Sequence, residues 1–151
     1  MRESKYSRLG LDSHADMTCV GSDAYIIDHV VGQSCTVHPF HESYSPKQNV
    51  QVCNAAFAFD HNNGETFILR LNQCLDFSSS MEHSLLCTNQ VRSHGIIVED
   101  APKAVDITHK SRQAIIIPNN DDEAKESIEL PLSMHGPVPY LSVRRPSESE
   151  Y

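Results

Sequence analysis

The amino-acid sequence predicts an all-β fold with one short helix, a small barrel or sandwich, from three observations. Apolar and polar side chains alternate over most of the chain, which is typical of strands that bury one face. Two of these alternating runs are separated by a short loop that ends in Asn63-Gly64, as in a β-hairpin. Helical spacing of apolar residues is confined to residues 84–95.

Composition and charge narrow the class of protein. The chain has 151 residues, enough for one domain with a sizeable core, and a net charge of −8. Because binding to phosphates needs clustered Lys and Arg, this charge argues against a nucleic-acid partner. The five cysteines are far apart and odd in number, which predicts reduced thiols in a cytoplasmic protein. No signal peptide or membrane-spanning apolar run is found, so no membrane association is expected.

The N-terminal part of the chain is expected to hold four strands. Residues 7–12 form the first, and residues 17–20 follow the polar stretch Asp-Ser-His-Ala-Asp. Residues 24–31 form the third strand, which is expected to end at Gly32, and residues 34–40 form a short fourth.

The hairpin comes next and has the clearest pattern. Phe57 and Phe59 share one face of its first strand, and Phe67, Leu69 and Leu71 share one face of its second. This alternation on both sides of the loop predicts two paired antiparallel strands.

A short helix follows the hairpin. Leu85, Leu86 and Val91 are spaced as on one helix face, Thr88 is a candidate cap, and Gly95 is expected to end the helix. The apolar run after it, residues 96–100, reads as another strand.

From residue 101 the composition changes. Two strand-like pieces, residues 113–118 and 128–143, flank an acidic stretch that reads as a linker or hairpin tip. Residues 144–151 are expected to be disordered. We therefore predict a domain of residues 1–100 and a β-rich extension of residues 101–151.

The polar stretch at Asp12–Asp16 interrupts this apolar pattern, and its residues alone leave three interpretations open. Asp12, His14 and Asp16 lie at every second position, so they would all face water on a half-exposed strand. The same spacing brings two carboxylates and an imidazole to one side, a set that suits zinc, manganese or iron. The third interpretation is a catalytic turn, in which an aspartate follows an apolar strand and precedes a hydroxyl residue.

A second segment, "FSSSMEHSLLCTNQVRSHG", decides which family the chain resembles. Together with "LGLDSHAD", the hairpin and "LPLSMHGPVPY", it is similar to the protease region of Ty1/copia-type retrotransposon polyproteins, in a subgroup with Asp-Ser-His-Ala-Asp at the turn. The residues of this segment that match the family pattern are Met81, His83, Leu85, Leu86, Gln90, Val91 and Gly95. The resemblance implies a retropepsin-like small closed barrel and covers residues 9–100, and more loosely the extension.

The resemblance also implies roles for the turn. Asp12 would be the catalytic aspartate, one from each subunit of a homodimer, and Ser13 would hydrogen-bond across the dimer axis. Ala15 would pack behind the turn. His14 replaces the usual glycine, and Asp16 would be its local charge partner.

Two further elements receive roles from the resemblance. The hairpin tip, His61, Asn62, Asn63 and Gly64, is a flap candidate that would close over a peptide, with residues 41–49 as another loop of suitable length. Leu85 and Leu86 would pack behind the catalytic loop.

These observations leave three functions open. The first is an aspartic endopeptidase that cleaves its polyprotein as a homodimer, with a water activated by two aspartates and no metal or cofactor. The second is an inactive retrotransposon remnant with the same fold. The third is a metal-binding β-domain that uses Asp12, His14 and Asp16.

Overall fold

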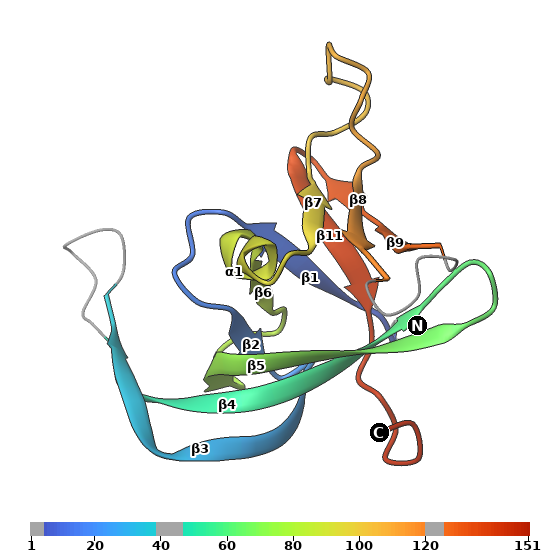
Figure 1. Cartoon of the computed structure of the whole chain (residues 1–151). Helices are drawn as coiled ribbons and strands as arrows, with labels where there is room; N and C mark the ends of the chain where they lie inside the picture. Colours follow the sequence, from blue (N-terminus) through green and yellow to red (C-terminus); the bar gives the residue numbers. More distant parts are fainter. Residues whose placement is uncertain (1–4, 39–46, 120–125) are drawn as a thin grey trace, which may run out of the picture.

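The strands form two sheets in the computed structural model, which describes residues 5–38, 47–119 and 126–151 (Figure 1). The larger sheet has eight strands in the order β10-β11-β1-β6-β2-β5-β4-β3, and the smaller has the order β7-β8-β9. In chain order the elements are β1 Ser7–Asp12, β2 Cys19–Gly21, β3 Tyr25–Val37, β4 Lys47–Asp60, β5 Thr66–Ser78, β6 Leu85–Cys87, α1 Thr88–Ser93, β7 Ile97–Glu99, β8 Ala114–Ile117, β9 Ile128–Pro131, β10 Ser133–His135 and β11 Val138–Val143. The predicted all-β class with one short helix is confirmed.

The predicted closed barrel is not found among the described residues. The large sheet is open, with β10 and β3 at its edges, and β3, β4 and β5 curve beneath the other strands in Figure 1. A single antiparallel bridge joins Ala58 of β4 to Arg144, just after β11. Each residue's N–H donates to the other's carbonyl, at 2.8 and 3.0 Å. This single bridge links β4 to the segment after β11, without a continuous ladder between the two strands.

The hairpin prediction is confirmed by β4 and β5, which pair from Phe59↔Phe67 to Asp60↔Thr66 around the tip. At that tip Gly64 has a φ of +92°, a conformation that glycine adopts without strain. By contrast, Gly32 does not end a strand as predicted. It lies inside β3, where its φ of +76° accompanies an irregular register between His29 and Ser34.

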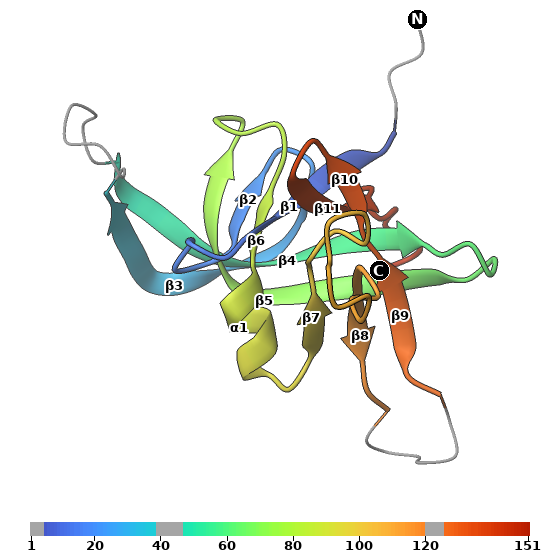
Figure 2. The same cartoon turned by 90° about the horizontal axis from the view of Figure 1, so that it is seen from above.

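One apolar core joins the two sheets. Leu9 and Phe57 of the large sheet share it with Ile115 and Leu130 of the small sheet, and all four are at most 4% exposed. Figure 2 shows β7, β8 and β9 crossing β4 and β5. Because β11 also pairs with β1, the boundary predicted at residue 100 does not separate two folding units.

The end of the chain is ordered, not disordered as predicted. The guanidinium of Arg144 donates to both carboxylate oxygens of Asp60, at 2.8 and 3.0 Å, and to Glu150 at 2.7 Å. The hydroxyl of Tyr151 accepts a hydrogen bond from Arg70. These contacts fasten residues 144–151 to the hairpin. Among the described residues, no helix has the length and apolarity needed to cross a membrane.

Replacing Arg144 by glutamine should change how the stability of the fold depends on pH. The hydrogen bond from Arg144, with those from Tyr6 and Thr66, holds the pKa of Asp60 well below its usual value. Arg144 also lowers the pKa of Glu150 from 4.5 to about 2. Both carboxylates therefore stabilise the fold at pH values above their unfolded pKa values. This contribution is lost as the pH falls toward 2.

Urea unfolding at a series of pH values from neutral to acid measures this effect. Arg144→Gln should be less stable than wild type at neutral pH and should lose less stability on acidification. Arg145→Gln removes an exposed charge next to it and serves as the control. If the unfolding free energies of Arg144→Gln and wild type depended equally on pH, these ion pairs would not be what holds residues 144–151 to the hairpin.

Candidate active site

The Asp12 turn is positioned by the strand β6. β6 lies between β1 and β2, parallel to β1 with Leu11↔Leu86 and Asp12↔Cys87 as partners, and antiparallel to β2. Residues 13–18, which connect β1 to β2, must therefore pass over the end of β6 where α1 begins (Figure 1). The chain direction thus places Asp12 beside the junction of β6 and α1.

Three hydrogen bonds fasten the turn to that junction. The side-chain amide of Asn89 donates to the carbonyl of Ser13 at 3.2 Å. The thiol of Cys87 donates to the carbonyl of Ala15 at 2.9 Å, and the N–H of Cys87 donates to the hydroxyl of Thr18 at 3.1 Å. The segment that follows Asp12 is therefore fixed by residues more than 65 positions away in the sequence.

Asp12 itself stays accessible. It is half-buried at the end of β1, and its Oδ1 accepts the N–H of His14 at 2.9 Å. Its Oδ2 has no hydrogen-bond partner within the described part of the chain. The site therefore presents one carboxylate oxygen on a fixed backbone.

The other residues of the turn point away from the core. Ser13, His14 and Asp16 are exposed and Ala15 is half-buried. The expected pairing of His14 with Asp16 is not among the ion pairs of the described residues. His14 has no positive φ, so the backbone here does not require the glycine it replaces.

The geometry gives the metal interpretation no support. Within residues 5–38, 47–119 and 126–151, no three His, Cys, Asp or Glu side chains are placed to hold an ion together. The alternating positions of Asp12, His14 and Asp16 do not converge, because the strand ends at Asp12 and the following residues form a turn.

Cys19, Cys53 and Cys74 are protonated thiols at neutral pH. Burial, and then the charge of Asp12, raise the pKa of Cys19 to about 11. Burial likewise raises the pKa values of Cys53 and Cys74 to about 12. All five cysteines are free. Because a thiolate is the reactive form, none of these three thiols is suited to act as a nucleophile.

The predicted packing residues lie directly behind the turn. Leu86 is 3% exposed and belongs to the main core with Leu11, its partner in β1. Leu85 is half-buried and pairs with Cys19 of β2. The pair thus lies directly before α1, and its role behind a catalytic loop stays a prediction.

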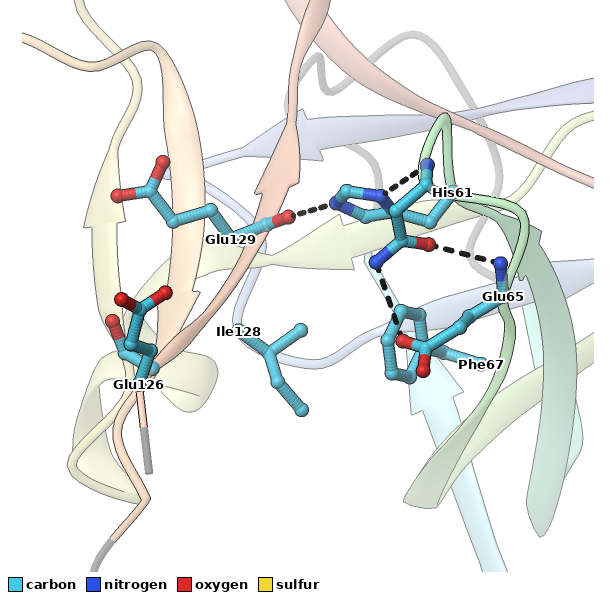
Figure 3. A pocket seen from close by; sticks show the side chains of 8 residues that line it. His61, Glu65, Phe67, Glu126, Ile128 and Glu129 are labelled. Atoms are coloured by element: carbon cyan, nitrogen blue, oxygen red, sulfur yellow. Dashed lines mark hydrogen bonds between the residues drawn. The ribbon is translucent and has the colours of Figure 1, made fainter. Parts of the chain in front are cut away.

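The flap candidate lies at the tip of the β4–β5 hairpin, whereas β2, which follows the Asp12 turn, pairs with the other end of β5 (Cys19↔Leu75). Its tip is held against β9, where Nε2 of His61 donates to the carbonyl of Glu129 at 2.8 Å (Figure 3). Nδ1 of His61 accepts the N–H of Asn63. The single chain thus gives no support to a flap at residues 61–64, and most of the alternative loop lies outside the described residues.

Asn89, Cys87 and Thr18 are site residues that sequence reasoning missed. The sequence around Asp12 does not indicate them, because it is the position of β6 in the sheet that brings these residues together. A possible signal was the polar triplet Cys-Thr-Asn directly after Leu85-Leu86, since β6 runs parallel to the strand that ends in Asp12.

Replacing Thr88 by valine should stabilise the protein by about 1 kcal/mol. Thr88 begins α1, is 0% exposed, and has the one buried side-chain hydroxyl without a partner among the described residues. Valine has the same shape without the unpaired polar group. Urea unfolding of this variant and of Thr18→Val, whose hydroxyl is bonded, should give opposite signs, and a destabilised Thr88→Val would contradict the prediction.

No family model matches the chain, and neither the curated proteins nor the solved structures include a match.

Proposed function

We propose that the chain is a retropepsin-like aspartic endopeptidase that acts as a homodimer in the cytoplasm, each copy contributing Asp12. The observation that carries the proposal is the carboxylate of Asp12, half-exposed on a turn whose backbone is fixed by Asn89 and Cys87. An aspartate held in this way is pre-organised for catalysis, whereas a solvated strand face needs no such support.

One chain supplies one such carboxylate, and the chemistry needs two. When two carboxyl groups share a site, one stays protonated and the pair activates a water. A two-fold axis next to the turn would bring Asp12 and its copy together. Ser13, which is exposed next to Asp12, would hydrogen-bond to the second copy across that axis.

The reaction is hydrolysis of a peptide bond. The ionised carboxylate takes a proton from the water, whose oxygen attacks the peptide carbonyl, while the protonated carboxyl donates to the carbonyl oxygen. Transfer of a proton to the amide nitrogen then releases the two products. The sequence resemblance to the protease region of Ty1/copia-type polyproteins makes the chain's own polyprotein the expected substrate.

An inactive relative with the same fold is the second candidate. The observation that favours it is His14, two residues after Asp12, at the position where the resembled family has glycine. One observation speaks against this second candidate: the turn holds His14 without a left-handed backbone.

Peptide cleavage with and without a metal chelator tests the proposal, with wild type, Asp12→Asn and Asp16→Asn compared from mildly acidic to neutral pH. Asp16 is the matched control because it is an exposed carboxylate on the same turn. Asp12→Asn should lower the cleavage rate by about 10²- to 10⁴-fold, and Asp16→Asn should keep most of it. No cleavage by folded, dimeric wild type would favour the inactive relative, and loss of cleavage with chelator would favour a metal site.

A further inference from the structure

Residues 101–113 form a loop that projects from the small sheet, between β7 and β8, and is drawn at the top of Figure 1. The loop, called here the docking loop, carries two of the most exposed large apolar side chains in the described residues. Val105 is 70% exposed and Ile107 is 91% exposed. Single exposed apolar residues are common, but two on one projecting loop indicate a contact surface.

The docking loop is ordered by polar contacts within it. The carboxylate of Asp106 accepts four hydrogen bonds, from the N–H and hydroxyl of Thr108 and from the N–H groups of Lys110 and Ser111, at 2.7 to 3.0 Å. These bonds fold the chain around one acidic group. Val105 and Ile107, on either side of Asp106, are therefore held in place while they face the solvent.

Hydrogen bonds also join the two ends of the docking loop. The hydroxyl of Ser111 donates to the carbonyl of Ala101 at 2.6 Å, and the side-chain oxygen of Gln113 accepts the N–H of Lys103 at 3.0 Å. Gln113 in turn donates to the carbonyl of Leu132 in the body of the protein at 2.7 Å. A loop fixed in this way loses little conformational entropy when it binds a partner.

The charge around the apolar pair is positive, in contrast with the chain as a whole. The side chains of Lys103 and Lys110 are exposed and pair with no carboxylate among the described residues. Asp106, the acidic residue between them, is turned inward by its four hydrogen bonds. The surface that fits this loop is an apolar hollow with carboxylates at its rim.

The same chain has such a hollow beside β9, next to the base of the docking loop, where Arg112 pairs with Glu129. A cavity of about 660 Å³, called here the hairpin pocket, lies between the β4–β5 tip and β9 (Figure 3). Phe67 and Ile128 supply its apolar surface, and Glu65, Glu126 and Glu129 stand around them. Glu129 is paired with Arg112, whereas Glu126 has no ion-pair partner among the described residues. The apolar side chains and the carboxylates of the hairpin pocket therefore complement the apolar pair and the lysines of the docking loop.

We propose that the docking loop of one copy binds in the hairpin pocket of a second copy. Ile107 would enter the pocket against Phe67 and Ile128, and Lys103 and Lys110 would lie against Glu65 and Glu126. The two surfaces differ, so the contact is head-to-tail: in a pair, the first copy keeps a free pocket and the second copy keeps a free loop. The contact is separate from the two-fold dimer proposed at Asp12 and does not depend on it.

Sedimentation velocity of the full chain over a range of concentrations tests this contact. A head-to-tail contact is open-ended, so the average mass of wild type should keep rising with concentration. Ile107→Asp, the loop variant, should weaken this association at least about tenfold because it brings a carboxylate to an acidic, apolar pocket. The pocket variant, Glu65→Lys with Glu126→Lys, should do the same. Val31→Asp is the matched control, since Val31 is 97% exposed on β3.

Mixing the two variants makes the test specific. The loop variant keeps an intact pocket and the pocket variant keeps an intact loop, so their equimolar mixture should reach a higher average mass than either alone. A two-fold dimer at Asp12 would be present in every sample and would not produce this difference. A wild-type mass that does not rise above that of the loop variant would overturn the proposal, as would a mixture no heavier than its parts. Binding of wild type, and not of Ile107→Asp, to anionic vesicles without self-association would overturn it in favour of a membrane surface.

Discussion

Replacing Gly21 by alanine is expected to destabilise the protein by about 3 kcal/mol, at the upper end of the usual cost of overpacking. Gly21 is the last residue of β2 and is buried. A Cβ at this position would fall on the carbonyl oxygen of Met81 and lie 2.9 Å from its carbonyl carbon. Because the obstacle is backbone, no change of rotamer can relieve the clash.

The site would be affected together with stability. The carbonyl of Met81 also accepts the N–H of Ser22 at 2.8 Å, and Met81 precedes the segment that leads into β6. The N–H of Gly21 donates to the buried hydroxyl of Ser84 at 2.9 Å, which in turn donates to Asp23 at 2.6 Å. Movement of Gly21 would therefore displace β6, the strand that positions the Asp12 turn.

Chemical denaturation of Gly21→Ala, with Gly10→Ala as the control, measures the effect. A Cβ on Gly10 would meet only the Cδ2 atom of Leu85 at 3.4 Å, an ordinary side-chain contact, so this variant should lose much less stability. Equal stability of the two variants would show that β2 and the Met81 segment are not as close as described.

Strand alternation and turn chemistry were sufficient to predict the hairpin. Phe57 and Phe59 on the first strand, and Phe67 and Leu69 on the second, repeat with a period of two. Gly64 provides the conformation that the tip requires. The same local information was insufficient for β6, because Leu85–Cys87 is three residues long and too short to show a period. Its apolar pair was therefore recognised ahead of the helix, but not as a strand of the sheet.

The remaining errors concern contacts between distant residues. Arg144 orders the C-terminal segment by binding Asp60, which is 84 positions away, and nothing in the local composition indicates that pairing. The candidate site shows the same difference between local patterns, which the sequence reveals, and distant contacts, which it does not. Asp12 could be identified from its own turn, whereas Asn89 and Cys87 depend on the position of β6 between β1 and β2.

The second large effect expected is on catalysis, in mixtures of wild type with Asp12→Asn. If each active site takes one Asp12 from each of two copies, a mixed dimer has a single carboxylate and cannot share a proton between two. Asparagine keeps the shape of the side chain, so the variant should fold and still exchange into dimers. Activity should then follow the number of dimers with two wild-type chains.

The most direct measurement is the rate of peptide cleavage at constant total protein as Asp12→Asn replaces wild type. Asp16→Asn, mixed in the same proportions, is the control for the effect of removing a charge from the turn. A half-and-half mixture with Asp12→Asn should retain about one quarter of the wild-type rate, because the rate varies with the square of the wild-type fraction. A rate of about one half, in proportion to the wild-type fraction, would show that each chain works alone and would contradict a catalytic site shared between two copies.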